Sequence, residues 1–386
     1  PSNENRTPSV IALIGMAGRF PGSDTIGELW ENLRDGKETI SLFSKEELDP
    51  SLPESLRKDP LYIGARGILS SAKEFDANFF GLNLQLAAAM DPQIRIFLEI
   101  SYEALEQSGH LPKHYKGSIG VYSGSEINTY YENNIFPNNE LKSAVGDLQI
   151  YTVNGKDFIA PRTSYHLNLK GPSISVHSAC STSLLAVAEA VKAIRTGMCD
   201  VALAGGSSVT APINSGHLYD DGFIKSPDGS TRSFDASGKG TVFSDGAGVV
   251  VLKKLEEAEK DGDIIYGIIK GVGVNNDGGD KGSFMAPSAK GQAGAIIKAF
   301  NDAQISPSTI TYMEAHGTAT PIGDPIEIEG LKIAYGKQKK NNYCALGSIK
   351  SNMGHTTAAA GVAGLNKTLL ATQHKQVPPM VNSDKP

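Results

Sequence analysis

Two segments of the chain, residues 173–195 and 343–371, share one pattern that limits the folds open to the whole. Each begins with a short apolar stretch expected to be a strand, SISVHSA in the first and YCALGSI in the second. Each then passes through a turn or polar loop into a helix rich in Ala and Leu. Strands that alternate with helices predict an α/β architecture. The repeat is compatible with two halves of a duplicated fold, although α/β proteins also repeat such units without duplication.

The rest of the chain continues this alternation. Apolar, glycine-bounded runs predict strands at residues 10–15 and 117–124, and apolar faces predict helices at residues 27–33 and 95–107. No low-complexity tract divides the chain. The first nine residues, PSNENRTPS, are polar and are expected to form a flexible lead-in, so that one ordered domain runs from residue 10 to residue 386.

Charge and cysteine content narrow the class of protein. The net charge of -6 argues against a nucleic-acid binder, which usually has a basic face. The three cysteines are odd in number and have no CxxC spacing, so a disulfide framework is not expected. No apolar run reaches the ~18 residues of a membrane span, and the N-terminus does not resemble a signal peptide. These features predict a cytoplasmic protein.

Cys180 is the strongest candidate nucleophile. It lies between the predicted strand and helix of the first repeated unit, in the sequence HSACSTSL. A thiol at a helix start faces free backbone N–H groups and the positive end of the helix dipole, which lowers its pKa and favours the thiolate. The alternative, a structural cysteine that acts as a small hydrophobe, remains about equally open from the residues alone. Cys199 and Cys344 lack this setting and are expected to be core residues.

Two of the eight histidines, His316 and His355, follow predicted strands and stand beside glycine. In such positions a side chain can point into a cleft. Two imidazoles that face one thiolate could polarise a thioester carbonyl and stabilise an enolate. The alternative is a pair of ordinary core or turn histidines.

Thr318 and Thr320 alternate along the chain, so both hydroxyls could point the same way and bind an amide-rich arm. Ordinary turn threonines are the alternative, and Gly323-Asp324-Pro325 predicts a turn. No phosphate-binding loop and no convincing metal-ligand spacing is found. Neither a nucleotide nor a metal is therefore expected.

Taken together, these motifs resemble the ketosynthase domain of type I modular polyketide synthases, including hybrids with nonribosomal peptide synthetases. The resemblance runs from Ile11 to about Pro379. It includes the nucleophile motif, two histidine motifs, an opening segment, an early helix and one further long match. In this chain they read GPSISVHSACSTSL, MEAHGTATPIGDPIE, SIKSNMGHTTAAAG, IALIGMAGRFPGSDTIGELWENLRDG, MDPQIRIFLEISYEALEQSG and GFIKSPDGSTRSFDASGKGTVFSDGAGVVVLK.

The resemblance implies the thiolase fold, in which two similar α/β halves form five α-β-α-β-α layers, usually in a homodimer. It also implies acyl carrier protein domains and neighbouring synthase domains as partners. No cofactor is expected to bind directly, because the substrates are carried on the phosphopantetheine of the acyl carrier protein.

The resemblance assigns a role to each candidate residue. Cys180 would accept the growing acyl chain, and a malonyl-type carrier thioester would decarboxylate to an enolate that attacks it. His316 and His355 match the two catalytic histidines. Lys350 matches the lysine that supports the region of the second histidine, and Thr318 and Thr320 match threonines that contact the pantetheine arm.

Three departures from the family pattern stand out. Ala319 occupies a position where glycine is commoner, and His177 occupies one that is usually acidic or polar. The family's domain also continues past PPMVNSDKP into a strand and a glycine-rich loop that supplies an oxyanion-hole donor. The C-terminal end of the domain is therefore expected to be missing from this chain.

Decarboxylative Claisen condensation between acyl carriers is the hypothesis that these residues favour. A non-elongating gatekeeper, which binds acyl chains or acts as a dimerisation scaffold, is the first alternative. A Cys/His thioester hydrolase is the second, and release of free acid from an acyl carrier would identify it.

Overall fold

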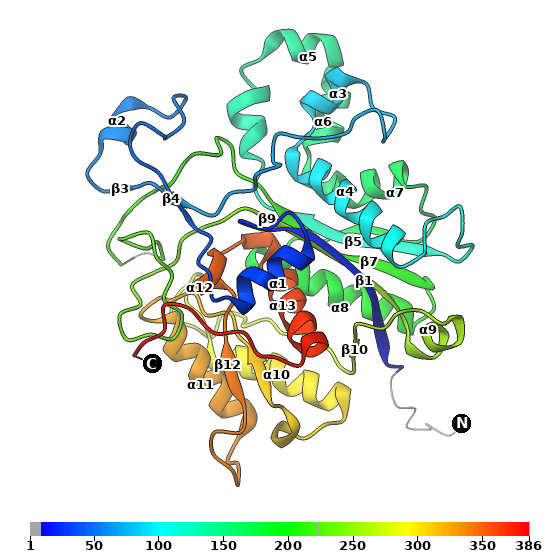
Figure 1. Ribbon diagram of the computed structural model, residues 1–386, viewed down its shortest axis with the longest axis vertical. Coiled ribbons are helices and arrows are strands. Elements are labelled where there is room, and N and C mark those ends of the chain that lie inside the picture. The colour runs from blue at the N-terminus through cyan, green and yellow to red at the C-terminus, as the bar shows by residue number, and fades with distance from the viewer. Residues whose placement is uncertain (1–8, 223, 386) are drawn as a thin grey trace.

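A mixed six-stranded sheet lies at the centre of the computed structural model, which describes residues 9–222 and 224–385 (Figure 1). The strand order is β10-β1-β9-β7-β5-β6. β5 runs parallel to β6 and β7, whereas β9 is antiparallel to both β7 and β1. The strands are β1 (Ile11–Arg19), β5 (Ile119–Ser125), β6 (Ser173–Ser175), β7 (Val201–Ser208), β9 (Gly246–Lys254) and β10 (Gly267–Ile269).

Apolar side chains on both faces of this sheet fix the helices that cover it. Along β9, Val249 and Val251 belong to one buried cluster, and Val250 and Leu252 belong to another, as strand geometry requires. The first cluster includes residues of α4 (Pro92–Gln107) and α7 (Ile159–His166). The second includes residues of α1 (Ile26–Arg34), α8 (Thr182–Arg195) and α13 (Ala360–His374). A sheet buried on both faces explains its nearly continuous apolar strands.

A second, smaller sheet lies beyond α13. It pairs β11 (Tyr312–Glu314) with β12 (Ala345–Gly347) in parallel. α10 (Ala289–Ala303) and α11 (Gly323–Tyr335) pack together on its far side (Figure 1). The layers therefore follow the order α-β-α-β-α, with α8 and α13 in the middle, and this confirms the expected fold class.

The two halves are unequal within the described residues. The first sheet has six strands, and the second has two. One reason is that β10 pairs with β1 at the edge of the first sheet, where Ile269 is opposite Ile11. The similarity of the halves is thus clearest in their strand–turn–helix units and weaker in their sheets.

Short elements surround these layers. Residues 45–75 contain one short helix and two two-residue strands. The remaining elements are β2 (Ser41–Leu42), α2 (Glu54–Lys58), β3 (Tyr62–Ile63), β4 (Ala65–Arg66), α3 (Leu84–Ala89), η1 (Tyr131–Ile135), α5 (Asn139–Val145), α6 (Asp147–Asn154), η2 (Lys156–Phe158), η3 (Ala179–Ser181), β8 (His217–Leu218), α9 (Leu255–Asp261), η4 (Pro307–Thr309), α12 (Lys350–Met353) and η5 (Thr357–Ala359).

Local capping explains why the predicted helices begin where they do. Thr25 and Glu28 form a capping box at the start of α1, and Asp91 accepts a hydrogen bond from the backbone of Gln93 before α4. Residues 1–8 of the predicted lead-in lie outside the described residues. Its last residue, Ser9, accepts a hydrogen bond from Arg195 Nε (2.9 Å).

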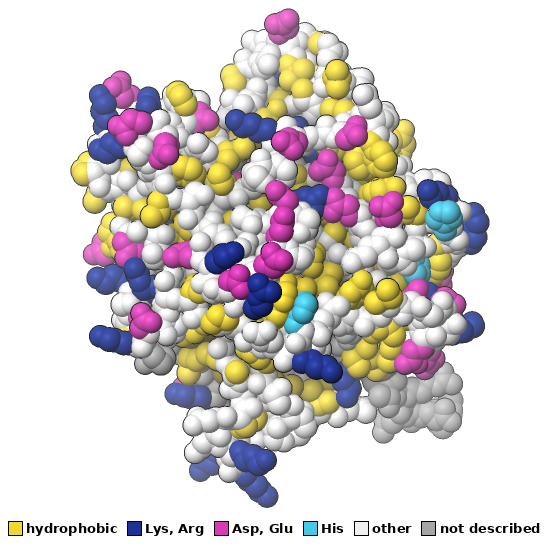
Figure 2. All heavy atoms as spheres, viewed as in Figure 1, with side chains coloured by type: hydrophobic (Ala, Val, Ile, Leu, Met, Phe, Trp, Pro, Cys, Tyr) yellow, Lys and Arg dark blue, Asp and Glu magenta, His cyan; other side chains and the backbone are white. Residues whose placement is uncertain are grey.

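The outer surface carries charges of both signs. Acidic and basic side chains are interspersed over the face in Figure 2. Within residues 9–222 and 224–385, no helix has the length and apolar character needed to cross a membrane.

Candidate active site

Cys180 lies in a tight turn between β6 and α8. The turn is the single 3₁₀ turn η3, and Ala179 just before the cysteine has a φ of 51°. This left-handed conformation is strained for a residue with a Cβ. Thr182 holds the turn by accepting a hydrogen bond from the backbone N–H of Ser178 (2.9 Å). Strained backbone at this point presents the half-buried thiol at the start of the helix.

His316 follows β11, and hydrogen bonds to its backbone hold it in place. Glu327 of α11 accepts hydrogen bonds from the backbone N–H groups of His316 (2.7 Å) and Gly317 (2.8 Å). Lys350 Nζ lies 3.3 Å from Nδ1 of the imidazole. Thus α11 holds the backbone of this residue, and α12 contacts its ring.

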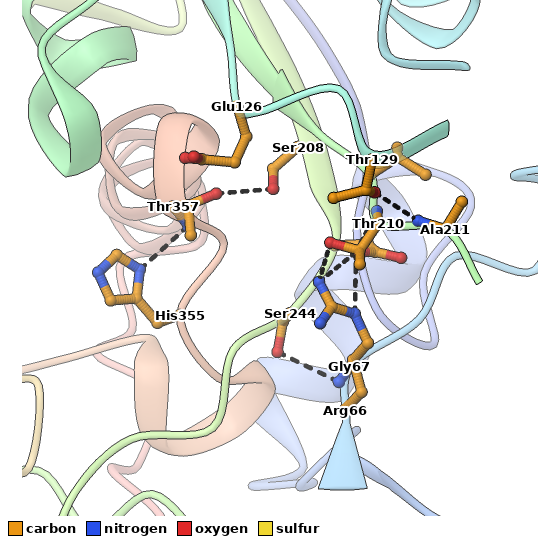
Figure 3. A network of polar contacts seen from close by, with 12 residues as sticks. Arg66, Gly67, Glu126, Thr129, Ser208, Thr210, Ala211, Ser244, His355 and Thr357 are labelled. Atoms are coloured by element: carbon orange, nitrogen blue, oxygen red, sulfur yellow. Dashed lines mark hydrogen bonds and ion pairs between the residues drawn. The ribbon is translucent and has the colours of Figure 1, made fainter. Parts of the chain in front are cut away.

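His355 is buried at the end of the loop before η5. Its Nδ1 accepts a hydrogen bond from the backbone N–H of Thr357 (3.0 Å), whose hydroxyl donates to Ser208 (2.6 Å; Figure 3). The ring stacks on Phe243 with centroids 5.5 Å apart. Only 2% of the residue is exposed, so packing on all sides restrains the ring.

The structure brings these three residues to one point. The sulfur of Cys180 and one ring nitrogen from each of His316 and His355 all lie within 4.8 Å of one another. The two imidazoles meet edge to face, with centroids 5.2 Å apart. Residues that are far apart in sequence, from both halves of the fold, therefore form one cluster.

Hydrogen bonding sets the tautomers of both rings. The ammonium group of Lys350 and the backbone N–H of Thr357 can only donate, so Nδ1 of His316 and Nδ1 of His355 each accept. A neutral imidazole that accepts at Nδ1 carries its proton on Nε2. Both rings can therefore offer an N–H donor to a group bound beside Cys180.

Both rings are neutral at physiological pH. The charge of Lys350, assisted by burial, lowers the pKa of His316 to about 3. Burial, followed by the charge of Lys350, lowers the pKa of His355 well below its ordinary value. The His316 residue is exposed to solvent. The charge of Lys350 is therefore the main cause of the lowered pKa, and burial of the ring adds to it.

The predicted thiolate at Cys180 is wrong for the free protein. Burial raises the pKa of the Cys180 thiol, and the charge of Lys350 and a backbone N–H only partly oppose this effect. The helix start could be predicted from the sequence, but the burial of the sulfur could not. Burial removes the sulfur from water and so disfavours the thiolate. The resting residue is a thiol at neutral pH.

Three nearby ligand atoms also raise the question of a metal centre. Among the described residues, Cys180, His316 and His355 form the one group of this kind. A metal ion would have to displace the protons on both Nε2 atoms and would lie close to the ammonium of Lys350. The donor set therefore fits an anionic or carbonyl oxygen better than a cation.

Lys350 itself is 3% exposed, and its hydrogen bond goes to the first histidine, His316. The family resemblance instead implies a link to the region of the second histidine. Its charge lowers the pKa of both rings, so it acts on the pair. The pKa of Lys350 is lowered by burial, and the carboxylates of Glu327 and Glu314 oppose this shift.

Thr318 and Thr320 point the same way, as their alternation predicted, and their hydroxyl oxygens lie 3.2 Å apart. The Thr320 hydroxyl also accepts a hydrogen bond from the backbone N–H of Gly323 at the start of α11 (3.0 Å). Thr320 therefore has a structural contact in addition to any contact with a ligand.

Two carboxylates that support the site were missed in the sequence. Glu327 holds the His316 backbone, and Asp324 accepts from the backbone N–H groups of Ala319 (3.0 Å) and Phe234 (2.7 Å). Burial raises the pKa of Asp324 to about 6. Both carboxylates lie within the motif MEAHGTATPIGDPIE, in the first five residues of α11, where Gly323-Asp324-Pro325 had predicted a turn and not a helix start.

Asp324 also supports the turn at the unusual residue, Ala319. Ala319 is buried and has a φ of 60°, a conformation that glycine adopts without strain. Glycine is therefore the better residue for this turn, and in this chain the turn is maintained by Asp324 and by Gly240, whose N–H donates to the Ala319 carbonyl (2.8 Å).

Comparison with protein families identifies the class that this fold and site define. The model described as "Beta-ketoacyl synthase, N-terminal domain" matches residues 9–258, and "Beta-ketoacyl synthase, C-terminal domain" matches residues 266–384. The chain belongs to the β-ketoacyl synthase family.

Within this family, the chain resembles the ketosynthases of modular polyketide synthases. It is 42% identical to one subunit of the phenolphthiocerol/phthiocerol polyketide synthase of Mycobacterium tuberculosis over 98% of its length, and 36% identical to polyketide synthase PksN of Bacillus subtilis over 97%. These alignments span 26% and 7% of the two relatives. The chain thus corresponds to a fraction of each.

Solved structures agree with the fold described above. Ketosynthase twelve of the bacillaene polyketide synthase from Bacillus amyloliquefaciens superposes with a TM-score of 0.91 at 37% identity, over 98% of this chain and 66% of that one. The module 1 ketosynthase of the same synthase gives 0.85 at 36%, over 99% and 68%. The thiolase fold of these ketosynthases is therefore the fold of this chain.

Proposed function

We propose that this chain catalyses decarboxylative Claisen condensation between a malonyl-type carrier thioester and an acyl chain held on Cys180. The observation that carries the proposal is the cluster of Cys180, His316 and His355, whose functional atoms lie within 4.8 Å of one another. Family membership supports the same reaction.

The first step loads the enzyme. Cys180 sulfur attacks the carbonyl of an acyl-pantetheine thioester, the bond to the pantetheine sulfur breaks, and the proton of the Cys180 thiol ends on the released pantetheine thiol. Because thiolate is the reactive form and burial raises the pKa of Cys180, the positive charge of Lys350 assists this step.

The second step makes the carbon–carbon bond. The malonyl-type thioester loses carbon dioxide, and the negative charge of the enolate develops on its thioester oxygen. The Nε2–H groups of His316 and His355 donate to this oxygen, where donors arranged in advance are most effective. The enolate carbon then attacks the acyl-Cys180 carbonyl, and the Cys180 thiolate leaves as the β-ketoacyl product forms.

Lys350 and the two threonines support this reaction without touching the reacting atoms. Lys350 occupies Nδ1 of His316 and keeps the ring neutral, so that its donor stays on Nε2. Thr318 and Thr320 contact the amide-rich pantetheine arm through their neighbouring hydroxyls. Lys350 is in this scheme a positioning residue.

The partners follow from the same proposal. Acyl carrier protein domains deliver both thioesters on phosphopantetheine, neighbouring synthase domains flank the chain, and two copies form a homodimer in the cytoplasm. What supports these partners is the relatives' description as polyketide synthases.

Intact-protein mass spectrometry tests the proposal directly. The protein is incubated with a short acyl pantetheine thioester and then with malonyl-loaded carrier protein. We expect an acyl mass on Cys180, followed by its discharge as a β-ketoacyl carrier product. An acyl mass that stays on Cys180 would instead indicate the non-elongating gatekeeper, and release of free acid would indicate a hydrolase.

A further inference from the structure

One carboxylate beside the cluster has no place in the chemistry above. Glu126 is the first residue after β5, and it lies at the carboxyl end of the sheet next to Ser207 and Ser208 at the end of β7. Figure 3 shows its side chain extending toward Thr357, on the side of the network where His355 lies and away from Arg66. Glu126 is half-buried, and η5, which carries Thr357, packs against both β5 and the turn η3 that holds Cys180.

The backbone of Glu126 is firmly held. Gln93, which is fully buried, accepts from its N–H (3.0 Å) and donates to its carbonyl (3.3 Å), and Ser207 accepts from the same N–H (3.2 Å). These contacts fix the start of the side chain without using the carboxylate. The backbone position is therefore rigid, and the carboxylate takes no part in these contacts.

The carboxylate works against the nucleophile. Its charge raises the pKa of Cys180, whereas the reaction needs thiolate. Within the described residues Glu126 forms no ion pair, and its one side-chain hydrogen bond comes from the neighbouring backbone N–H of Ile127 (3.1 Å). Most of the hydrogen-bond acceptor sites of the carboxylate are therefore free. Because the carboxylate disfavours the Cys180 thiolate, we look for a different role that would explain its position.

We propose that Glu126 is a specificity-determining residue that selects acyl chains bearing a hydrogen-bond donor, a hydroxyl or a protonated amine, close to the thioester. In this inference, an acyl chain on Cys180 extends toward the end of β5 and meets this carboxylate. A chain with a donor satisfies its free oxygens, whereas a saturated hydrocarbon chain removes them from water without replacement. This inference rests on the proposed function, because it concerns the chain that Cys180 carries.

Competitive acyl loading tests the inference. Butanoyl, 3-hydroxybutanoyl and 3-aminobutanoyl pantetheine thioesters are offered to the protein, and the rate of mass gain at Cys180 is measured for each. We expect each donor-bearing chain to load about tenfold faster than butanoyl, the size of one hydrogen bond to a charged group. In Glu126→Leu the order should reverse in favour of butanoyl.

The isosteric Glu126→Gln variant separates the two donors. It keeps a carbonyl acceptor but removes the charge, so the preference for the amine should fall by about tenfold while the preference for the hydroxyl changes only a few-fold. Glu132→Gln is the matched control, because Glu132 is exposed on the same segment and lies six residues further along. It should leave all three rates unchanged.

The outcomes distinguish this inference from the proposed function. Loading of all three chains at equal rates, or a preference that persists in Glu126→Leu, would overturn the selective role and leave condensation intact. Loading of none of them at Cys180 would overturn the proposed function and the inference together.

Discussion

The two strand–turn–helix units place their reactive side chains in contrasting settings. In the unit of β6 and α8, Cys180 is half-buried and lies on a strained turn. In the unit of β12 and α13, His355 is enclosed, with Nδ1 bonded and the ring stacked on Phe243. In the proposed reaction, a nucleophile that meets a carrier-bound chain needs access, whereas a donor that must keep one tautomer needs restraint. The same local fold thus serves two different demands.

The largest effect should come from removing the nucleophile. In Cys180→Ala, acyl loading should disappear, a loss of at least about 10³-fold, because no other group forms the covalent intermediate. Intact-protein mass spectrometry measures it. Cys344→Ala, which removes a half-buried thiol outside the cluster, should load normally. Loading that persists in Cys180→Ala would contradict the assignment of the nucleophile.

Removing the imidazole of His355 should affect condensation far more than acyl loading. In His355→Ala, condensation should fall about 10²–10³-fold, the effect of losing one oxyanion donor, while loading changes only a few-fold. Single-turnover assays on the preloaded enzyme measure condensation alone. Because the ring is buried, retained loading also reports that the fold is intact. Equal losses in both steps would argue that His355 acts in loading instead.

The two reaction steps should also differ in their dependence on pH. Burial raises the pKa of Cys180, so below that pKa the thiolate fraction, and with it the loading rate, should rise about tenfold per pH unit between about pH 6 and 8. The pKa of His316 is about 3, and that of His355 is also lowered, so neither ring titrates in this range. Condensation from preloaded enzyme should therefore vary less than about threefold, and a tenfold rise per unit in it would count against neutral rings.

The smallest effect concerns the turn after His316. Ala319→Gly should raise the free energy of unfolding by up to about 1 kcal/mol, because glycine removes the cost of a positive φ at a small cost in chain entropy. Ala295→Gly within α10 should lower it by about 0.5–1 kcal/mol. Denaturant unfolding measures both, and two changes of the same sign would contradict the strain.

Local sequence patterns predicted the parts of the fold that local interactions control. α1 and α4 lie within one to three residues of their predicted bounds, because capping residues and apolar faces define them. β1 and β10 are the first and the last strand of the six-stranded sheet along the chain. Their pairing depends on contacts between these distant segments, and no pattern in either segment indicates it.

The site shows the same division. The motifs drew attention to Cys180, His316 and His355, because each stands at the end of a predicted strand. The contact of Lys350 with His316, the support from Glu327 and the raised pKa of Cys180 all depend on how distant segments pack. Burial and partner choice are tertiary properties, so they became visible only in the structure.

The proposed chemistry requires that His316 and His355 face Cys180 as neutral Nε2–H donors. Two-dimensional ¹⁵N NMR of protein labelled at histidine, with His316→Gln and His355→Gln variants for assignment, reads the tautomer of each ring directly. We expect neutral Nε2–H rings for both residues from about pH 6 to 8. An imidazolium, or a proton on Nδ1, at either residue in this range would contradict it.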